Sequence, residues 1–260
     1  MNPDRAKNSG RSGKRAWLFP VIVVTLAVIL IAASLGRSQG RDAATPGPVP
    51  TAEVSGQEQQ QRESAQDVYD KQAPLREEVE RRDAEDALSM GPVDAPVVLV
   101  VFSDYQCPYC AKWNAETLPT LQRHIDAGKL RLEWRDVNVF GEDSDRGARA
   151  AFAAGQQGRF WDYHEVLFAD GQSRTARELT EDNLIALAEE MGGLDMARFR
   201  ADLASVETKE AVDRNAMLGL QLGVASTPSF VFGGQPIVGA QPASVFESAF
   251  DLALAGAENS

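Results

Sequence analysis

The chain has little cysteine and little histidine: each occurs only twice in 260 residues. Two cysteines cannot build a small domain held together by several disulfides. Four soft ligands make a single zinc site only if every one of them takes part. Basic residues are outnumbered by acidic ones, 26 against 38, and the resulting net charge of −12 argues against a groove for nucleic acid.

Glycine and proline are too few for a low-complexity chain, and the apolar fraction of 43% is close to that of globular proteins. The length allows one or two domains with a substantial core. The charge is unevenly distributed, because residues 1–36 carry a net +4 and the remainder −16. We therefore expect an acidic folded body, with any membrane contact at the N-terminal end.

A run of twenty residues without a charge extends from Trp17 to Gly36. As a helix it would span roughly 30 Å, the thickness of the hydrocarbon core of a bilayer. Basic residues precede it, so the positive-inside rule predicts a cytoplasmic tail over 1–16, a single transmembrane anchor over 17–36 and an extracytoplasmic body. The alternative is a signal peptide cleaved near Ala32–Ser34, which also delivers the body to an oxidising compartment.

Residues 37–89 are predicted to be a flexible, partly helical linker, because small and polar residues dominate their first half. Folded sequence is expected over 90–256. A valine-rich run over 97–102 is typical of a strand buried on both faces. The alternation of apolar and polar residues over 130–140 indicates a second strand.

A helix is predicted over 109–126, with a kink at Pro119. A helical connection between two neighbouring strands makes them parallel. A helical insert follows over about 144–205, and a hairpin is expected around Gly233-Gly234. Pro242 opens a last helix. The predicted layout is therefore βαβ, a helical insert, and then ββα.

The two cysteines are three positions apart, as Cys107-Pro108-Tyr109-Cys110, at the junction of a predicted strand and helix. Unpaired amides at a helix N-terminus stabilise a thiolate, which is the attacking species in disulfide exchange. A second thiol one turn later can resolve the mixed disulfide. The pattern predicts Cys107 as nucleophile and Cys110 as resolving thiol.

Two other interpretations of the cysteine pair remain open at this stage. An inert disulfide would close a very short loop and would therefore stabilise the fold little. A zinc site would need His124 and His164 as further ligands, but these are forty residues apart and lack finger spacing.

The string FSDYQCPYC over 102–110, with TPSF over 227–230, resembles the DsbA-like branch of the thioredoxin superfamily. QGRFW over 157–161 and VGAQ over 238–241 are similar to that branch too, so the resemblance covers about residues 88–256. It implies an α/β thioredoxin fold with a helical insertion. It also implies that the bond before Pro228 is cis and that Thr227 and Pro228 face the cysteine pair. Taken without the resemblance, the residues favour a trans proline at a strand start.

The resemblance implies a membrane-anchored, extracytoplasmic thiol:disulfide oxidoreductase that needs no cofactor. Its expected substrates are cysteine-containing exported proteins, and its expected partner is a quinone-linked membrane oxidase of the DsbB or VKOR type. Pro108 and Tyr109 belong to the predicted site. Their Pro-Tyr dipeptide is that of glutaredoxins, whereas strong oxidants of the branch have Pro-His. A reductase or isomerase fed by a membrane electron donor is therefore an alternative, and a non-catalytic peptide-binding or chaperone module is another.

Five further residues have two interpretations each. Asp104 is either a group that influences proton transfer or, as we favour, a polar loop residue. Glu133 is either a buried acid beneath the thiols or, as the strand alternation favours, a solvent-facing side chain. We expect Trp113 and Trp161 in the core, and His164 as a packed histidine rather than a base.

Overall fold

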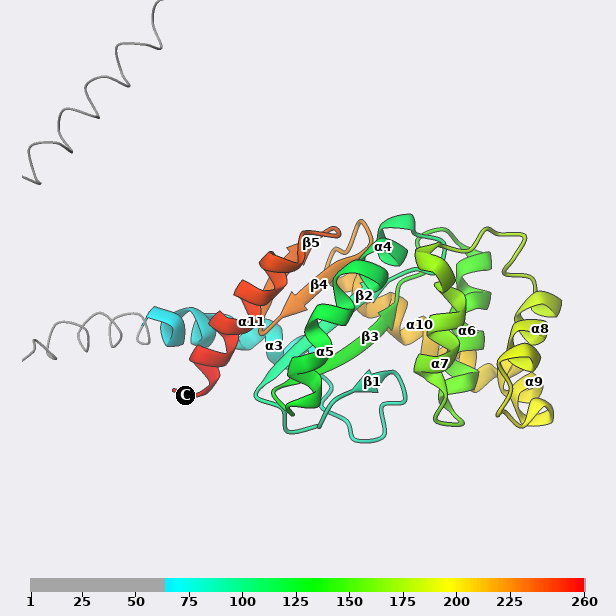
Figure 1. Ribbon diagram of the computed structural model, residues 1–260, viewed down its shortest axis with the longest axis horizontal. Coiled ribbons are helices and arrows are strands. Elements are labelled where there is room, and N and C mark those ends of the chain that lie inside the picture. Colours follow the sequence, from blue (N-terminus) through cyan, green and yellow to red (C-terminus); the bar gives the residue numbers. More distant parts are fainter. Residues whose placement is uncertain (1–63, 260) are drawn as a thin grey trace, which may run out of the picture. The chain divides into compact units, whose positions relative to one another are not determined.

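The computed structural model describes residues 64–259, in which a mixed five-stranded sheet has the order β1-β3-β2-β4-β5 (Figure 1). The strands are β1 (Ser89–Met90), β2 (Val97–Ser103), β3 (Leu130–Asp136), β4 (Ser229–Phe232) and β5 (Gln235–Val238). The helices are α3 (Ala73–Val79), α4 (Pro108–Glu116), α5 (Leu118–Asp126), α6 (Glu142–Gly155), α7 (Phe160–Leu167), α8 (Glu181–Met191), α9 (Met196–Ala204), α10 (Val206–Gln221) and α11 (Ala243–Ala257), with a 3₁₀ turn, η1, at Ala169–Gly171.

The two central strands, β2 and β3, are parallel and are buried along their whole length. Their register runs from Val97 opposite Leu130 to Ser103 opposite Asp136. The predicted βαβ unit is therefore confirmed. β4 pairs antiparallel with the other side of β2, and β5 forms the hairpin with β4.

The sheet has two buried faces. On one, which we call the thiol face, Leu99, Val101, Leu132 and Trp134 share a core cluster with both cysteines. On the other, the back face, Val98, Val100 and Phe102 pack with Val79 and with partly buried residues of α3 and α10. Helices therefore pack on both faces of the sheet: α4, α5 and α11 on the thiol face, and α3 and α10 on the back face.

Glu133 corrects the sequence analysis. Its side chain is fully buried on the back face rather than exposed to solvent, and it does not lie beneath the thiols. The backbone amides of Arg81 and Arg82 each donate to its carboxylate at 2.9 Å, and Arg131 and Arg135 donate at 2.8 and 2.6 Å. The alternation of apolar and polar residues predicted an exposed Glu133. The prediction failed because the segment that contains Arg81 and Arg82 covers this face of the sheet.

The packed structure begins earlier than the predicted boundary at Met90. Val79 of α3 is buried in the back-face cluster, and the short strand β1 pairs antiparallel with β3. α3 lies within the segment 37–89 that was predicted to be partly helical. No helix within residues 64–259 is long and apolar enough to span a membrane, and the anchor expected over 17–36 lies outside the described residues.

The helix predicted over 109–126 is divided into α4 and α5 at Thr117. Pro119 lies in the first turn of α5, where a missing N–H costs no helical hydrogen bond. The break therefore falls two residues before the proline. It leaves α4 as a short helix whose N-terminus carries the cysteines.

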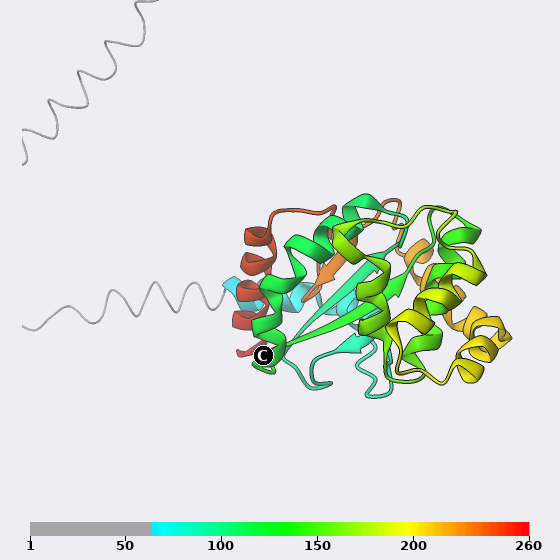
Figure 2. The same cartoon turned by 45° about the vertical axis from the view of Figure 1, so that its right-hand side comes forward.

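The connection from β3 to β4 is helical from α6 to α10. Figures 1 and 2 show α6 to α9 gathered beyond the end of the sheet, away from α11. The hairpin turn uses Gly233 and Gly234, with φ of 56° and 90°, values that side chains disfavour. At Gly234 a Cβ atom would also come within 2.6 Å of the Gln72 side chain.

Candidate active site

Cys107 occupies the N-cap of α4, directly after the loop that follows β2. Its backbone is extended, Pro108 takes the first helical position, and the Cys107 Sγ accepts a hydrogen bond from the Cys110 amide at 3.3 Å. Cys107 is 3% exposed and Cys110 1% exposed, and both are free thiols. The sequence thus places both sulfurs at one helix end.

The two thiols differ in acidity. A hydrogen bond from the Cys110 thiol lowers the pKa of Cys107 to about 6, against the opposing effect of burial. The Thr227 hydroxyl and the amides of Cys110 and Tyr109 lower it further. Burial, followed by the adjacent Cys107 sulfur, raises the pKa of Cys110 far above its ordinary value. At neutral pH the first thiol is therefore mainly a thiolate and the second stays protonated.

Thr227 and Pro228 lie against the first cysteine, although 120 residues separate them in sequence. The bond between them is cis, as predicted, and in its protonated form the Cys107 thiol donates to the Thr227 carbonyl oxygen at 3.2 Å. The juxtaposition arises because β4 begins at Ser229, which pairs with Phe102 near the end of β2. The Ser229 hydroxyl holds the loop by donating to the Ser226 carbonyl at 2.7 Å.

Pro108 and Tyr109 form the outer side of the cysteine turn. Both are exposed, and the Tyr109 side chain has 66% of its surface open to solvent. A large aromatic ring in water beside a reactive sulfur offers an apolar contact to an incoming chain. It supplies no positive charge to the Cys107 thiolate.

Asp104 is a buried loop residue with a definite structural task. Its carboxylate accepts from the Gln106 amide at 2.8 Å, from the Ser144 hydroxyl at 2.7 Å and from the Phe140 amide at 3.2 Å. The Asp104 carbonyl in turn accepts from the Cys107 amide at 3.0 Å. These contacts fix the loop that presents the first cysteine.

The aromatic residues near the site are core residues, as expected. Trp113 is buried, and Trp161 is partly buried with its indole N–H donating to the Ser89 carbonyl. His164 is fully buried between the Tyr105 hydroxyl and the side-chain amide oxygen of Asn114, and burial lowers its pKa to about 3. His164 is therefore a neutral packed histidine.

Sequence reasoning missed two buried polar residues on the thiol face, Ser103 and Asp136. They end the two central strands and lie opposite each other in the register. The signal was available, because each of the two parallel strands ends in a polar residue at a position whose alternate neighbours, Val101 and Trp134, are apolar. Within residues 64–259 no group of three or more His, Cys, Asp or Glu side chains could hold a metal ion.

A protein-family model of thioredoxin matches residues 83–251, which is well over half of the chain. The chain belongs to the thioredoxin family. Probable disulfide bond formation protein D of Bacillus cereus is 34% identical over 150 residues, which cover 56% of this chain and 69% of that protein.

Two solved structures support a thioredoxin-family oxidoreductase. Oxidised BdbD from Bacillus subtilis matches with a TM-score of 0.60 at 25% identity, covering 66% of this chain and 95% of that one. A thioredoxin-like oxidoreductase from Silicibacter pomeroyi matches with a TM-score of 0.53 at 32% identity, covering 65% and 96%. This thioredoxin-family chain is accordingly a protein disulfide oxidoreductase.

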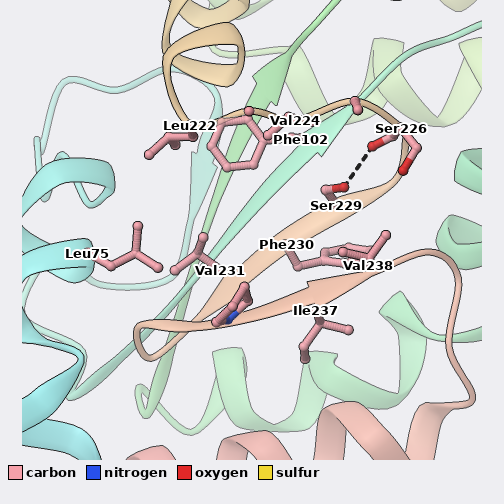
Figure 3. A pocket seen from close by; sticks show the side chains of 13 residues that line it. Leu75, Phe102, Leu222, Val224, Ser226, Ser229, Phe230, Val231, Ile237 and Val238 are labelled. Carbon is pink, nitrogen blue, oxygen red and sulfur yellow. Dashed lines mark hydrogen bonds between the residues drawn. The ribbon is translucent and has the colours of Figure 1, made fainter.

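A cavity of about 300 Å³ lies behind the loop that leads to Thr227 in this thioredoxin fold (Figure 3). Its walls include Leu75, Phe102, Leu222 and Val231 from the back-face side, and Ile237 from β5. Neither cysteine lines it. The exchange chemistry thus belongs to the end of α4 and not to this cavity.

Proposed function

We propose that the chain oxidises cysteines of exported proteins through a redox disulfide between Cys107 and Cys110. The observation that carries the proposal is the difference between the two thiols: one acidic at a helix N-terminus, the other buried and protonated. The chain has two cysteines in all, so an oxidoreductase of this sequence has a single pair to use. The B. cereus relative is named as a disulfide bond formation protein, which supports the oxidising direction.

In the proposed cycle, a substrate thiolate attacks the Cys107 sulfur of the disulfide form, and Cys110 leaves. The second substrate thiolate then attacks the substrate sulfur of the mixed disulfide, and Cys107 leaves as a thiolate. The substrate loses two electrons and the cysteine pair gains them. A low pKa makes Cys107 a good leaving group and stabilises the reduced protein, which is the property of an oxidant.

The substrate is proposed to be an extended peptide segment seated between Tyr109 and the Thr227-Pro228 loop. The Tyr109 ring supplies exposed apolar surface on one side of the Cys107 sulfur. The Thr227 carbonyl, which accepts a hydrogen bond from the Cys107 thiol in its protonated form, lies on the other side. Reoxidation is assigned to a quinone-linked membrane oxidase of the DsbB or VKOR type.

The catalytic domain is proposed to be extracytoplasmic and tethered by the uncharged segment over 17–36, with the N-terminus in the cytoplasm. The charge pattern of that segment supports this topology. A reporter fused after Ser260 should be active only outside the cytoplasm and should stay with the membrane fraction. Release of the full body from the membrane would instead support a cleaved signal peptide.

The decisive experiment is the equilibrium reduction potential of the pair against glutathione. A Cys107 pKa of about 6 lies between the values of thioredoxin and of the strongest oxidant. Thioredoxin has a potential of about −270 mV and the strongest oxidant one of about −120 mV. We expect the potential of this pair to lie between about −200 and −120 mV. A value near −270 mV would support the reductase alternative, which the uncharged Tyr109 favours. Full activity of a Cys107→Ser, Cys110→Ser double variant would support the chaperone alternative.

A further inference from the structure

His164 of α7 hydrogen-bonds to both sides of the cysteine turn. Its Nδ1 lies 3.2 Å from the hydroxyl of Tyr105, which is in the loop two residues before Cys107. Its Nε2 lies 2.8 Å from the side-chain oxygen of Asn114, which is on α4 one helical turn after Cys110. A residue of the helical connection thus joins the segment before the reactive sulfur to the helix that follows it.

The two partners decide which ring nitrogen carries the hydrogen. The amide oxygen of Asn114 can only accept, so Nε2 of His164 carries the hydrogen and donates it. Nδ1 then has a free lone pair and accepts from the Tyr105 hydroxyl. His164 is 1% exposed, and burial lowers its pKa to about 3, so the ring is neutral at pH 7. Because both nitrogens are already bonded, the imidazole has none free to act as a base for the cysteines.

Aromatic rings hold the imidazole in place. It lies edge-on to Trp134 of β3, with ring centroids 4.4 Å apart, and the rings of Trp161 and Phe168 lie at 5.1 Å each. These rings fix the orientation of the histidine, and burial keeps water from its two hydrogen bonds. A hydrogen bond in such a setting is electrostatically stronger than one in water. His164 is therefore a rigid point of attachment for its two partners.

The helix α4 needs such an attachment. It has nine residues, and a helix of this length is marginal without tertiary contacts. Trp113 packs against Phe230 and Phe246, with ring centroids 4.9 and 5.8 Å apart. Apolar packing of this kind is non-directional, whereas the hydrogen bond of Asn114 to His164 constrains the orientation of the helix.

The orientation of α4 matters because its first turn contacts the reactive sulfur. The Cys110 amide donates to the Cys107 Sγ at 3.3 Å, and a hydrogen bond weakens steeply as its donor turns away. We propose that His164 is a positioning residue for disulfide exchange: its two hydrogen bonds hold α4 against the loop of Tyr105, so that the first-turn amides stay on the Cys107 sulfur. The helical connection between β3 and β4 thereby takes part in the chemistry of the thioredoxin core.

The inference rests on the proposed role of Cys107 as nucleophile, but not on the direction or the location of exchange. Its test measures the pKa of Cys107 in the reduced full chain, by thiolate absorbance, together with the equilibrium against glutathione. The Cys110 thiol does not interfere, because its pKa lies far above that of Cys107.

His164→Phe keeps an aromatic ring in place and removes both hydrogen bonds. The Cys107 pKa should rise by at least about 0.5 unit, and the glutathione equilibrium at pH 7 should shift at least about twofold toward the disulfide form, because the thiolate loses stabilisation. His164→Gln offers one acceptor and one donor on its amide, so it should restore the pKa to within about 0.2 unit of the wild type. An unchanged pKa in His164→Phe would overturn the proposal.

Trp161→Phe is the matched control. It alters the same aromatic cluster and removes the hydrogen bond to the Ser89 carbonyl, but it leaves both hydrogen bonds of His164 in place. A residue that only stabilises the fold should lower the denaturation midpoint and leave the Cys107 pKa unchanged, which is the result expected for Trp161→Phe. A rise in the Cys107 pKa as large as that of His164→Phe would show that general loosening of the core causes it, and would overturn the positioning role.

Asn114→Ala tests the contact from the other side. Asn114 is partly exposed and alanine favours a helix, so α4 itself should not fray. The Cys107 pKa should again rise, and the double variant with His164→Phe should show no larger rise than the larger single one, because both remove the same contact. Additive rises would mean that the two residues act separately, against the proposal. If His164→Phe does not fold, an unchanged pKa in Asn114→Ala is sufficient to overturn it.

The same titration separates this inference from the proposed function. A wild-type Cys107 that titrates near the free-cysteine value of about 8.5 would refute the acidic nucleophile, and the positioning role with it. An acidic wild-type thiol with unshifted variants would refute the positioning role of His164 alone.

Discussion

Two acids of the same strand, Glu133 and Asp136, are both fully buried, but on opposite faces of the sheet. Burial raises the pKa of Glu133, but Arg135, Arg131 and two backbone amides outweigh that effect and lower it overall. Asp136 has one indole donor, and its pKa rises to about 7. The comparison shows that burial alone does not decide the ionisation of a carboxyl group. The number of donors and cations around it does.

The largest expected effect is the loss of disulfide exchange when a cysteine of the thiol face is replaced. Cys107→Ala should abolish disulfide exchange, and Cys110→Ala should leave substrates trapped on Cys107, because resolution is lost while the nucleophile remains. Both variants should unfold at about the denaturant concentration of the reduced wild type. Non-reducing gels and mass spectrometry detect the trapped species. Trapping by Cys107→Ala instead would reverse the assignment.

The second effect is on the stability of the back face. Glu133→Ala leaves Arg131 and Arg135 buried without their carboxylate, and breaking such a pair costs about 3–5 kcal/mol. Chemical denaturation of the full chain measures the loss. The pKa of Cys107, followed by thiolate absorbance, should stay near its wild-type value because Glu133 lies on the other face. A destabilisation below about 1 kcal/mol would show that the ion network contributes little.

The third effect is on the pH dependence of stability. The pKa of Asp136 is higher in the folded chain than in the unfolded one, so its protonated form favours folding. This contribution is complete below about pH 4 and is lost as pH rises to about 7, by at most about 4 kcal/mol. Asp136→Asn should remove the decline. His164, with its lowered pKa, acts in the opposite sense below pH 6.5, so the difference between wild type and variant isolates Asp136.

Denaturation curves of wild type and Asp136→Asn between pH 4 and 8 make this measurement. The variant should gain stability relative to the wild type as pH rises. A constant difference across the range would mean that Asp136 titrates normally in the folded chain.

The smallest effect is expected at the surface. Tyr109→His places a titratable cation beside the Cys107 thiolate, so the Cys107 pKa should fall and the potential should become less negative. Stability should change by less than about 0.5 kcal/mol, because Tyr109 is exposed. Tyr109→Phe is the matched control and should leave the pKa unchanged. Equal Cys107 pKa values in the wild type and both variants would show that the side chain at position 109 does not influence the acidity of the Cys107 thiol.

Local patterns predicted much of this fold. The valine run of β2, the turn at Gly233-Gly234 and the strand-to-helix position of the cysteines are all short-range signals. The resemblance added the cis bond before Pro228 and its contact with Cys107. What failed was long-range: Glu133 was assigned to solvent because residues 75–82, which cover its face, were interpreted as part of a linker.

Ser103 and Asp136 were missed for a related reason. Each is a polar residue at the end of its strand, and such a position is ordinary when a strand is considered alone. Their position side by side depends on the parallel pairing of β2 and β3, which neither strand reveals alone. The sequence shows that two residues are neighbours across a sheet only once the register of the two strands is known.

The amides of Arg81 and Arg82 that bind Glu133 belong to the main chain. Every residue except proline has a backbone N–H, so other residues at positions 81 and 82 could keep both hydrogen bonds. The contact therefore leaves no characteristic side-chain pattern in the sequence. Evolutionary comparison of side chains would therefore undervalue this segment. The practical consequence concerns protein engineering: a chain trimmed to start at Met90 would keep every residue of the active site and still lose two of the four donors to the buried Glu133 carboxylate.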